Sequence, residues 1–192
     1  TNSILGFLLS FFNGFTASVG NLNTEEDDEK KESVFYQILL LSFLICGVVS
    51  IAIILLSNDF ISIWLGNEYI LNFSVCFALG FNIYVEGMRF VNYTFRDTMG
   101  LFKKGRLIPL ISSICNVILS VILVQFWRMF GVLIATGITN LFITTMYDPY
   151  IIHKYKFNTS SRRYYLTYLY YLIIFILDLV ICSFVISNIR YR

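Results

Sequence analysis

Charged side chains are scarce in this sequence of 192 residues: 14 lysines and arginines and 12 acidic residues make up only 14% of the chain. A globular domain in water carries about a quarter charged residues, so this composition excludes a soluble protein with a water-facing surface. Two prolines and eleven glycines exclude a collagen-like or low-complexity chain. A net charge of +2 is too small for a nucleic-acid-binding surface, and we expect no nucleic-acid partner.

The sequence also lacks the residue patterns of metal, redox and catalytic sites. Its cysteines lie singly within apolar runs, without a CxxC pair or a neighbouring histidine, at Cys46, Cys76, Cys115 and Cys182. We interpret them as small core residues and expect no metal, disulfide or other cofactor. The single histidine, His153, is expected in a loop, and no carboxylate pair or His/Asp group supports catalysis. No G-x-x-x-x-G-K-[ST] phosphate loop is present, so the sequence does not support ATP-driven transport by this chain. We expect no enzymatic activity.

Long uncharged runs dominate what the sequence does contain, since 57% of its residues are hydrophobic and the mean hydropathy is +0.73. Crossing a bilayer takes about 20 apolar residues in a helix, and six segments meet or approach that length. The sequence thus predicts an all-α, polytopic integral membrane protein with six transmembrane helices. The expected helices cover residues 1–20, 34–57, 69–101, 107–127, 129–147 and 164–187.

The distribution of lysine and arginine predicts how these helices are oriented. Eleven of the 14 basic residues fall in the connections after the first, third and fifth helices, and three fall elsewhere. Cytoplasmic loops collect basic residues, so we expect these three connections in the cytoplasm and residue 1 on the outer side. Trp64 and Trp127 then lie at the outer interface, as an aromatic belt predicts. The acidic segment 25–32 is interpreted as a solvated loop in the first cytoplasmic connection.

The first expected helix has two further features. It begins without an initiator methionine or a preceding polar segment, so we expect the chain to be an internal piece of a larger membrane protein. It also carries small residues at four-residue spacing, which either allow the close approach of a neighbouring helix in lipid or line a cavity. These residues are Gly6, Ser10, Gly14 and Ser18.

The helix expected over residues 69–101 carries the densest polar stripe in the sequence. Asn82, Arg89 and Arg96 are seven residues apart and therefore share one helix face. Glu86 stands three residues before Arg89, at the spacing of a helical ion pair. At 1.5 Å per residue this helix would be about 50 Å long, which exceeds the ~30 Å hydrocarbon core. We therefore expect its end to project into the cytoplasm.

Asp178 interrupts the last apolar run near the expected middle of the membrane. An aspartate at that depth costs about 2.5–3.5 kcal/mol on insertion scales, and such residues usually face the bundle interior. Three interpretations stay open for Asp178: pairing with a helix outside this chain, coupling of transport to an ion, and no role.

Four segments of the sequence are similar to one known family. They resemble, in order and spacing, the second half of bacterial polysaccharide repeat-unit flippases of the O-antigen or capsule type, in the multidrug/oligosaccharidyl-lipid/polysaccharide exporter superfamily. The resemblance covers most of the chain, and its strongest part is residues 87–102. The segments are TASVGNL (residues 16–22), SIWLGNEYIL (62–71), GMRFVNYTFRDTMGLF (87–102) and DPYIIHKYKF (148–157).

The resemblance implies a larger bundle of two similar helical halves, within which residues 1–192 are a partial transmembrane transporter domain. It implies translocation of undecaprenyl-diphosphate-linked oligosaccharide repeat units across the bacterial cytoplasmic membrane, for surface polysaccharide biosynthesis. The expected partners are this lipid-linked oligosaccharide, membrane lipids and the remaining helices of the transporter.

Arg89 and Arg96 lie within the resembling segment and are candidate substrate-binding residues. A guanidinium binds phosphate oxygens bidentately and keeps its charge, so two arginines on one helix face would capture the diphosphate. Glu86 would orient Arg89, and Asn82 completes the candidate site. A simpler interpretation of Arg89 is a snorkelling side chain at the inner headgroup level, which obeys the positive-inside bias.

Two other functions stay open. A drug or small-cation exporter of the same superfamily needs a cavity lined by acids, whereas the polar stripe offers two arginines against Glu86 and Asp97. A membrane-embedded polysaccharide polymerase needs catalytic groups at the outer side, and no carboxylate pair or His/Asp group is expected there.

Overall fold

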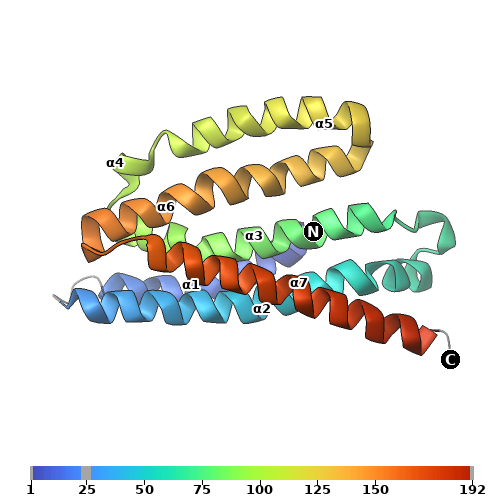
Figure 1. Ribbon diagram of the computed structural model, residues 1–192, viewed down its shortest axis with the longest axis horizontal. Coiled ribbons are helices and arrows are strands. Elements are labelled where there is room, and N and C mark those ends of the chain that lie inside the picture. The colour runs from blue at the N-terminus through green and yellow to red at the C-terminus, as the bar shows by residue number, and fades with distance from the viewer. Residues whose placement is uncertain (1, 23–26, 191–192) are drawn as a thin grey trace.

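The chain is all-helical in the computed structural model, which describes residues 2–22 and 27–190 (Figure 1). No β-strand occurs in these residues, so the predicted all-α class is confirmed. The π-helical turns η2 and η3 continue α5 and α6 into one helical stretch. The elements are α1 (Asn2–Leu22), α2 (Asp28–Trp64), η1 (Asn67–Tyr69), α3 (Phe73–Thr98), α4 (Phe102–Gly105), α5 (Ile108–Thr139), η2 (Asn140–Thr144), α6 (Thr145–Ile152), η3 (His153–Phe157) and α7 (Arg162–Arg190).

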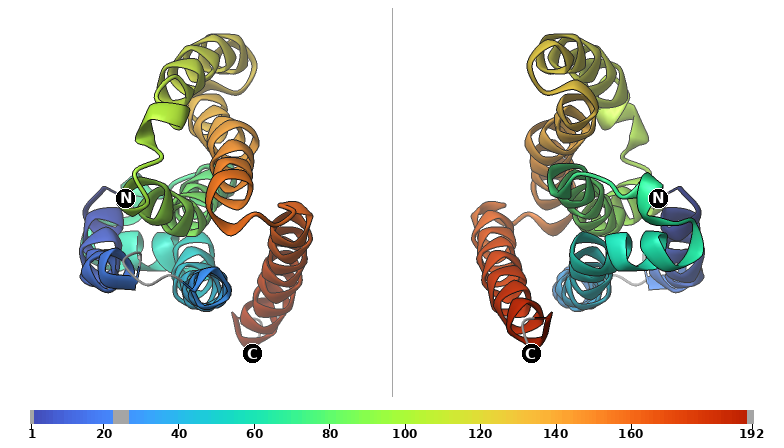
Figure 2. Two further views of the ribbon diagram at one scale, coloured as in Figure 1. Left: turned by 90° about the vertical axis from the view of Figure 1, so that its left-hand side faces the viewer. Right: turned by 90° about the vertical axis from the view of Figure 1, so that its right-hand side faces the viewer.

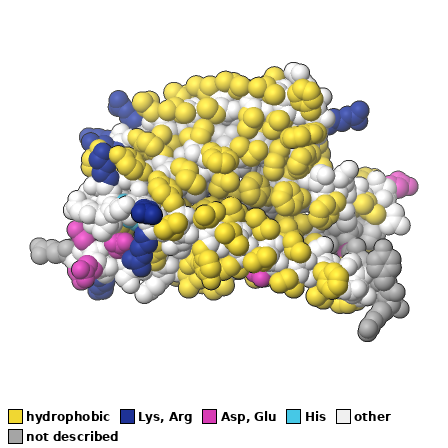
Figure 3. Space-filling model, in the orientation of Figure 1, with side chains coloured by type: hydrophobic (Ala, Val, Ile, Leu, Met, Phe, Trp, Pro, Cys, Tyr) yellow, Lys and Arg dark blue, Asp and Glu magenta, His cyan; other side chains and the backbone are white. Residues whose placement is uncertain are grey.

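Three helical stretches are long and apolar enough to cross a membrane: Asp28–Trp64, Phe102–Phe157 and Arg162–Ile189. Hydrophobic side chains cover the middle of the face seen in Figure 3, whereas charged side chains gather mainly toward its left end. The starts of α2, α5 and α7 lie at this same end of the molecule (Figure 1). The three basic connections expected in the cytoplasm therefore lead into helices that begin at one end.

Helix α2 (Asp28–Trp64) begins earlier than the predicted helix 34–57. The carboxylate of Asp27 accepts the backbone N–H groups of Glu29 and of the following residue, at 3.0 and 3.3 Å, and so caps the helix. Acids at its first two positions also complement the helix dipole. Much of the acidic segment is therefore the first turn of a helix rather than a solvated loop, and residues 25–26 lie outside the described residues.

Helix α3 is shorter than the predicted helix 69–101. Asn72 caps its start, because the Asn72 side-chain oxygen accepts the backbone N–H of Ser74 at 3.0 Å. The helix ends at Thr98, just before Gly100 takes a φ of +71°, a left-handed conformation that glycine adopts without strain. With 26 residues, α3 is about 39 Å long, which still exceeds the ~30 Å hydrocarbon core of a bilayer.

Helix α5 contains a reversal at Arg128, whose φ of 47° and ψ of −129° are not helical. The reversal divides α5 into a first arm, residues 108–127, and a second arm, residues 129–139, which run antiparallel (Figure 1, Figure 2). The second arm continues through η2, α6 and η3. Asn116 on the first arm donates its Nδ2 to the Thr136 hydroxyl on the second arm at 3.2 Å. The reversal coincides with the predicted boundary between helices 107–127 and 129–147, although the second arm is longer than predicted.

Glycines on α3 allow its close approach to α2. A Cβ atom at Gly80 would lie 2.7 Å from the carbonyl oxygen of Ser50, and one at Gly87 would overlap the side chain of Cys46. The two glycines are seven residues apart and therefore face the same neighbour. Small residues of this kind let two backbones approach in lipid, so α2 and α3 pack closely along this face.

The small-residue face predicted on α1 is exposed at its two glycines. A Cβ atom at Gly6 or Gly14 would meet nothing within 4 Å. Helix α1 packs on α3 through larger side chains instead: the buried ring of Phe12 stacks on Phe90, with ring centroids 5.1 Å apart. The side chain of Ser18 lies outside the described residues. No described helix packs closely against Gly6 or Gly14, so both interpretations of this face, packing against a helix outside this chain and lining of a cavity, stay predictions.

The four cysteines are free, and they lie in different environments. Cys46 and Cys76 are buried, as expected of small core residues, whereas Cys182 is half-buried on α7. Cys115 is exposed on the first arm of α5. The expectation of a core position is wrong for Cys115, because this arm packs on one side only.

Candidate functional site

The polar stripe of α3 meets the second arm of α5 in a closed group of three side chains. Arg89 Nη2 pairs with Glu86 Oε1 at 3.0 Å, at the predicted i, i+3 spacing. Asn140, at the start of η2, accepts a hydrogen bond from Arg89 Nη1 at 3.3 Å and donates one to Glu86 Oε2 at 3.4 Å. The side chains of Arg89 and Glu86 stay 27% and 24% exposed, so a ligand can reach them.

One heptad further along α3, Arg96 makes a more buried ion pair. Its Nη1 lies 3.0 Å from Asp148 Oδ1 on α6, and its Nε lies 3.0 Å from Asp97 Oδ1. The side chain of Asp148 is 3% exposed and that of Arg96 is 13% exposed. A charge at such a depth is very costly without a partner, so this pair fixes α6 against the C-terminal end of α3.

Both arginines line one cavity of about 310 Å³ between α3 and the first turns of α5. Ser112, Ser113 and Asn140 place polar groups in its wall. A second cavity of about 280 Å³ lies on the α1 side of the stripe, where Asn13 and Arg89 line it. Arg89 therefore borders both cavities and is the more accessible of the two arginines.

This arrangement can bind an anion, but it also carries acids. A guanidinium offers five N–H donors in a planar fork, more than Glu86 and Asn140 take up at Arg89. Glu86 lines one cavity and Asp148 lines the other, so an anionic ligand competes with carboxylates for the guanidinium groups. Arg89 suits such a ligand better than Arg96, which two carboxylates hold already.

The structure does not bring Asn82 to either of these cavities. Its Nδ2 donates to the carbonyl oxygens of Ala78 on α3 and of Leu133 on the second arm of α5, both at 2.8 Å. The helices also approach closely at Gly137, where a Cβ atom would lie 3.1 Å from Asn82 Oδ1. Asn82 therefore holds α5 against α3, and its place on the polar stripe serves this packing.

Asp178 is exposed on α7. Helix α7 lies at one flank of the molecule in the end-on views of Figure 2 and packs mainly against α2. The interior orientation expected for Asp178 is therefore not found within residues 2–22 and 27–190. The side chain lies away from the arginines of α3, and a part in ion coupling stays a prediction.

The sequence did not identify two members of the site, Asn140 and Asp148. They are separated by 51 and 52 residues from their arginine partners, so no local pattern connects them. The sequence gave one signal for Asp148, because this residue ends the uncharged run 129–147. The sequence gave no signal for Asn140, since a single amide in an apolar helix also serves helix packing.

A second polar group joins α2, η3 and α7 around His153. The imidazole is fully buried in a helical turn, not in a loop as predicted, because the second arm continues to Phe157. Its Nδ1 lies 2.8 Å from the Pro149 carbonyl oxygen, which can only accept, so Nδ1 carries the proton. Its Nε2 then accepts the hydroxyl of Tyr36 at 3.3 Å. The guanidinium of Arg163 lies over the Tyr36 ring, 4.5 Å from its centroid.

Within the described part of the chain, no group of three or more His, Cys, Asp or Glu side chains could hold a metal ion. Comparison of the chain with protein-family models, with curated proteins and with solved structures finds no match. The function is therefore inferred from the side chains around Arg89.

Proposed function

We propose that this chain contributes six membrane spans to a transporter that moves undecaprenyl-diphosphate-linked oligosaccharide from the inner to the outer leaflet of a bacterial cytoplasmic membrane. The similarity of four segments to polysaccharide repeat-unit flippases supports this proposal. The six spans are α1, α2, α3, the two arms on either side of Arg128, and α7. Helices outside this chain complete the wall of the transport cavity.

The observation that carries the proposal is the pair of arginines that line one cavity of about 310 Å³. Arg89 and Arg96 lie on the half of α3 nearer the end where the basic residues gather (Figure 1, Figure 3). That end is cytoplasmic by the positive-inside bias, and a lipid-linked diphosphate enters from the same leaflet. The guanidinium groups in the cavity therefore lie near the leaflet from which the diphosphate of the substrate enters.

The two arginines have different parts in this proposal. Arg89 captures the diphosphate, since it is the more exposed of the two and a guanidinium binds phosphate oxygens bidentately. The Ser112 hydroxyl, in the wall of the same cavity, is a further donor for the phosphate. Arg96 is a positioning residue, because its ion pair with Asp148 keeps α6 and the cavity wall in place.

A second candidate is an exporter of small organic cations from the same superfamily. The observation that favours it is the acid content of the site, since Glu86 and Asp148 line the cavities that Arg89 borders. A cation would then bind to Glu86, the more exposed of the two carboxylates.

Substitution of Arg89 in the full-length protein distinguishes these functions. Arg89→Lys keeps the charge but loses the bidentate fork, so we expect both Arg89→Lys and Arg89→Gln to abolish most polysaccharide export. Arg106→Gln is the matched control, since it removes an exposed arginine that does not line the cavity. Export is measured in cells that lack the native gene, at equal membrane levels of each variant.

The outcomes separate three cases. Loss of export in both Arg89 variants, with Arg106→Gln unaffected, supports diphosphate capture. Full export by Arg89→Lys contradicts it and leaves Arg89 a snorkelling residue. Normal export together with loss of resistance to cationic drugs in Glu86→Gln favours the cation exporter instead.

The proposed orientation has its own test. Asn67 in η1 and Asn158 after η3 are both exposed and lie near opposite ends of the molecule (Figure 1). In a variant without the four native cysteines, we expect Asn67→Cys to react with an impermeant thiol reagent in intact cells and Asn158→Cys to be protected. Labelling of Asn158→Cys with protection of Asn67→Cys would reverse the topology.

A further inference from the structure

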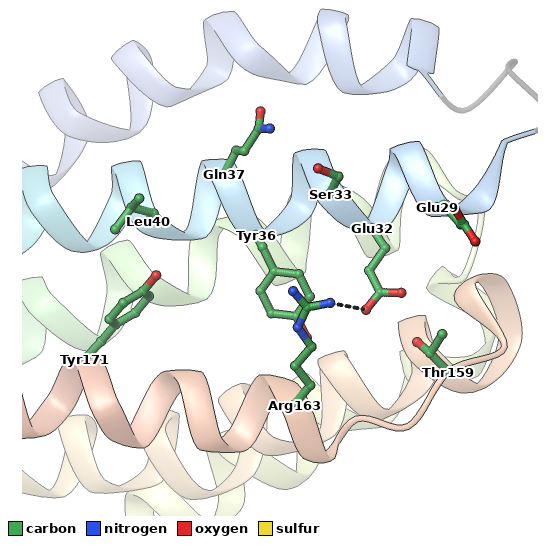
Figure 4. Close-up of a pocket in the computed structure, with 9 residues that line it drawn as sticks. All are labelled: Glu29, Glu32, Ser33, Tyr36, Gln37, Leu40, Thr159, Arg163 and Tyr171. Carbon is green, nitrogen blue, oxygen red and sulfur yellow. Dashed lines mark ion pairs between the residues drawn. The ribbon is translucent and has the colours of Figure 1, made fainter.

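A groove of about 710 Å³ runs between α2 and α7 at the end of the molecule where the basic residues gather (Figure 4). Helix α2 contributes Glu29, Glu32 and Tyr36 to its wall, and α7 contributes Arg163. None of these residues lines the two cavities that border Arg89. The groove is therefore a separate site, and the proposed transport of oligosaccharide makes no use of it.

Arg163 and Glu32 face each other in this groove without a close hydrogen bond (Figure 4). Arg163 Nη1 lies 3.7 Å from Glu32 Oε1, whereas a charge-assisted hydrogen bond is about 2.7–2.9 Å long. The side chain of Arg163 is 70% exposed and that of Glu32 is 15% exposed. Glu29 adds a second carboxylate to the same wall. The guanidinium of Arg163 and the carboxylates of Glu29 and Glu32 are thus each able to bind a further group.

The floor under the Arg163 guanidinium is held firmly. The ring of Tyr36 supports the cation at 4.5 Å, and the buried His153 accepts the Tyr36 hydroxyl at 3.3 Å. His153 is itself fixed by the Pro149 carbonyl oxygen. These contacts fix the Tyr36 ring on which the guanidinium lies, and a floor that is already formed lowers the entropy lost on binding.

Away from these charges, Gln37, Leu40 and Tyr171 line the groove. Leu40 follows Tyr36 by one turn of α2, and Tyr171 of α7 stacks on Phe43 with ring centroids 4.5 Å apart and an interplanar angle of 11°. Both α2 and α7 are long and apolar enough to cross a membrane. The groove thus has charged side chains at one end and Leu40 and the Tyr171 ring at the other, between two apolar helices. This arrangement suits a phospholipid with its headgroup at the charged end and an acyl chain along the two helices.

We propose that this groove binds a phospholipid of the inner leaflet whose headgroup carries both a phosphate and a primary ammonium, a phosphoethanolamine lipid. Arg163 binds the phosphate, and Glu29 and Glu32 accept the N–H groups of the ammonium. The inference rests on the proposed orientation, in which α2 and α7 cross the membrane with their basic ends at the inner leaflet, and it does not depend on the transported substrate.

The charges in the groove select this headgroup over two others. Two carboxylates against one guanidinium leave the groove with a net negative charge, which repels an anionic phosphatidylglycerol. A choline headgroup carries the same phosphate, but its quaternary ammonium has no N–H to donate to Glu29 or Glu32. The phosphoethanolamine headgroup satisfies both kinds of charge.

Lipid retention by the full-length protein tests the inference. The protein is reconstituted in phosphatidylcholine nanodiscs that contain equal minor fractions of phosphatidylethanolamine and phosphatidylglycerol, and the lipids that stay bound in detergent are counted by native mass spectrometry. We expect the native protein to retain phosphatidylethanolamine preferentially. A hydrogen bond to a charged group contributes about 1.5–3 kcal/mol, so Arg163→Gln should lower this retention by about tenfold or more.

Two further variants make the test specific. Arg162→Gln removes an adjacent, exposed arginine that does not line the groove, and we expect phosphatidylethanolamine retention to change by less than about twofold. The double variant Glu29→Gln and Glu32→Gln should reverse the preference toward phosphatidylglycerol, because the repulsion is removed and Arg163 remains. Equal effects of the two arginine variants, or equal retention of the two lipids by the native protein, would overturn the inference. So would a native protein without bound lipid, the result expected if another helix fills the groove.

Discussion

Helix α3 is more polar than the first arm of α5, yet it is also the more buried of the two. Helix α3 carries charged and amide side chains along its length, yet its Tyr84, Val91 and Asn92 are completely buried. The first arm, residues 108–127, contains no charged residue, yet Val117 is 61% exposed. The more polar helix is thus central to the packing, whereas the more apolar one lies at the edge (Figure 2).

This difference is the reverse of what a protein in water shows, and it has a physical cause. Lipid chains are as apolar as leucine, so apolar surface gains little by moving from lipid into the bundle. Close packing of small residues, hydrogen bonds and ion pairs decide instead which faces meet. Gly80, Gly87 and Arg96 of α3 supply all three kinds of contact, and the first arm has few such groups to offer.

Breaking the buried ion pair between Arg96 and Asp148 should have the largest effect on the unfolding free energy. Asp148→Ala leaves the Arg96 guanidinium without its buried partner, so we expect a loss of about 3–5 kcal/mol in unfolding free energy. The measurement is chemical unfolding of the purified protein in detergent micelles.

Asp97→Ala is the matched control for Asp148→Ala, because Asp97 pairs with the same arginine at the same distance but is 36% exposed. An exposed pair contributes about 0–1 kcal/mol. Equal losses in the two variants would show that burial of Asp148 does not govern the strength of the pair.

The close packing of α2 on α3 should be next in magnitude. Gly80→Ala places a methyl group 2.7 Å from the Ser50 carbonyl oxygen, and overpacking of this kind costs about 1–3 kcal/mol. Gly14→Ala on α1 meets nothing within 4 Å and should stabilise by about 0.5–1 kcal/mol through helix propensity. Midpoints of thermal unfolding should therefore move in opposite directions. A fall of similar size in both variants would contradict the assignment of α3 as the packing helix.

The smallest effect is expected when the same substitution, isoleucine to valine, is made in α3 and in the first arm of α5. Ile83→Val on α3 removes a methylene at a position that is 0% exposed, and should cost about 0.5–1.5 kcal/mol. Ile118→Val on the first arm of α5 makes the same change at a position that is 56% exposed, and should stay within about 0.5 kcal/mol. Unfolding of the two variants under identical detergent conditions measures the difference. A larger loss at Ile118 would indicate that the first arm packs against another surface in the micelle.

Features that depend on neighbouring residues could be predicted from the sequence. The uncharged runs gave the all-helical class, and the break between them at Arg128 coincides with the reversal of α5. The i, i+3 spacing gave the ion pair between Glu86 and Arg89, because helix geometry alone brings such side chains together.

The rest was decided by tertiary structure. Asn140 and Asp148 reach the arginines of α3 only because the chain turns back at Arg128 and the second arm packs along α3. The same packing takes Asn82 away from the cavity, and the position of α7 at one flank leaves Asp178 exposed. In the sequence, every polar residue within an apolar run looks alike. Whether it binds a backbone, pairs with a charge or faces the outside depends on which helix lies opposite, and that is set by the packing of the whole bundle.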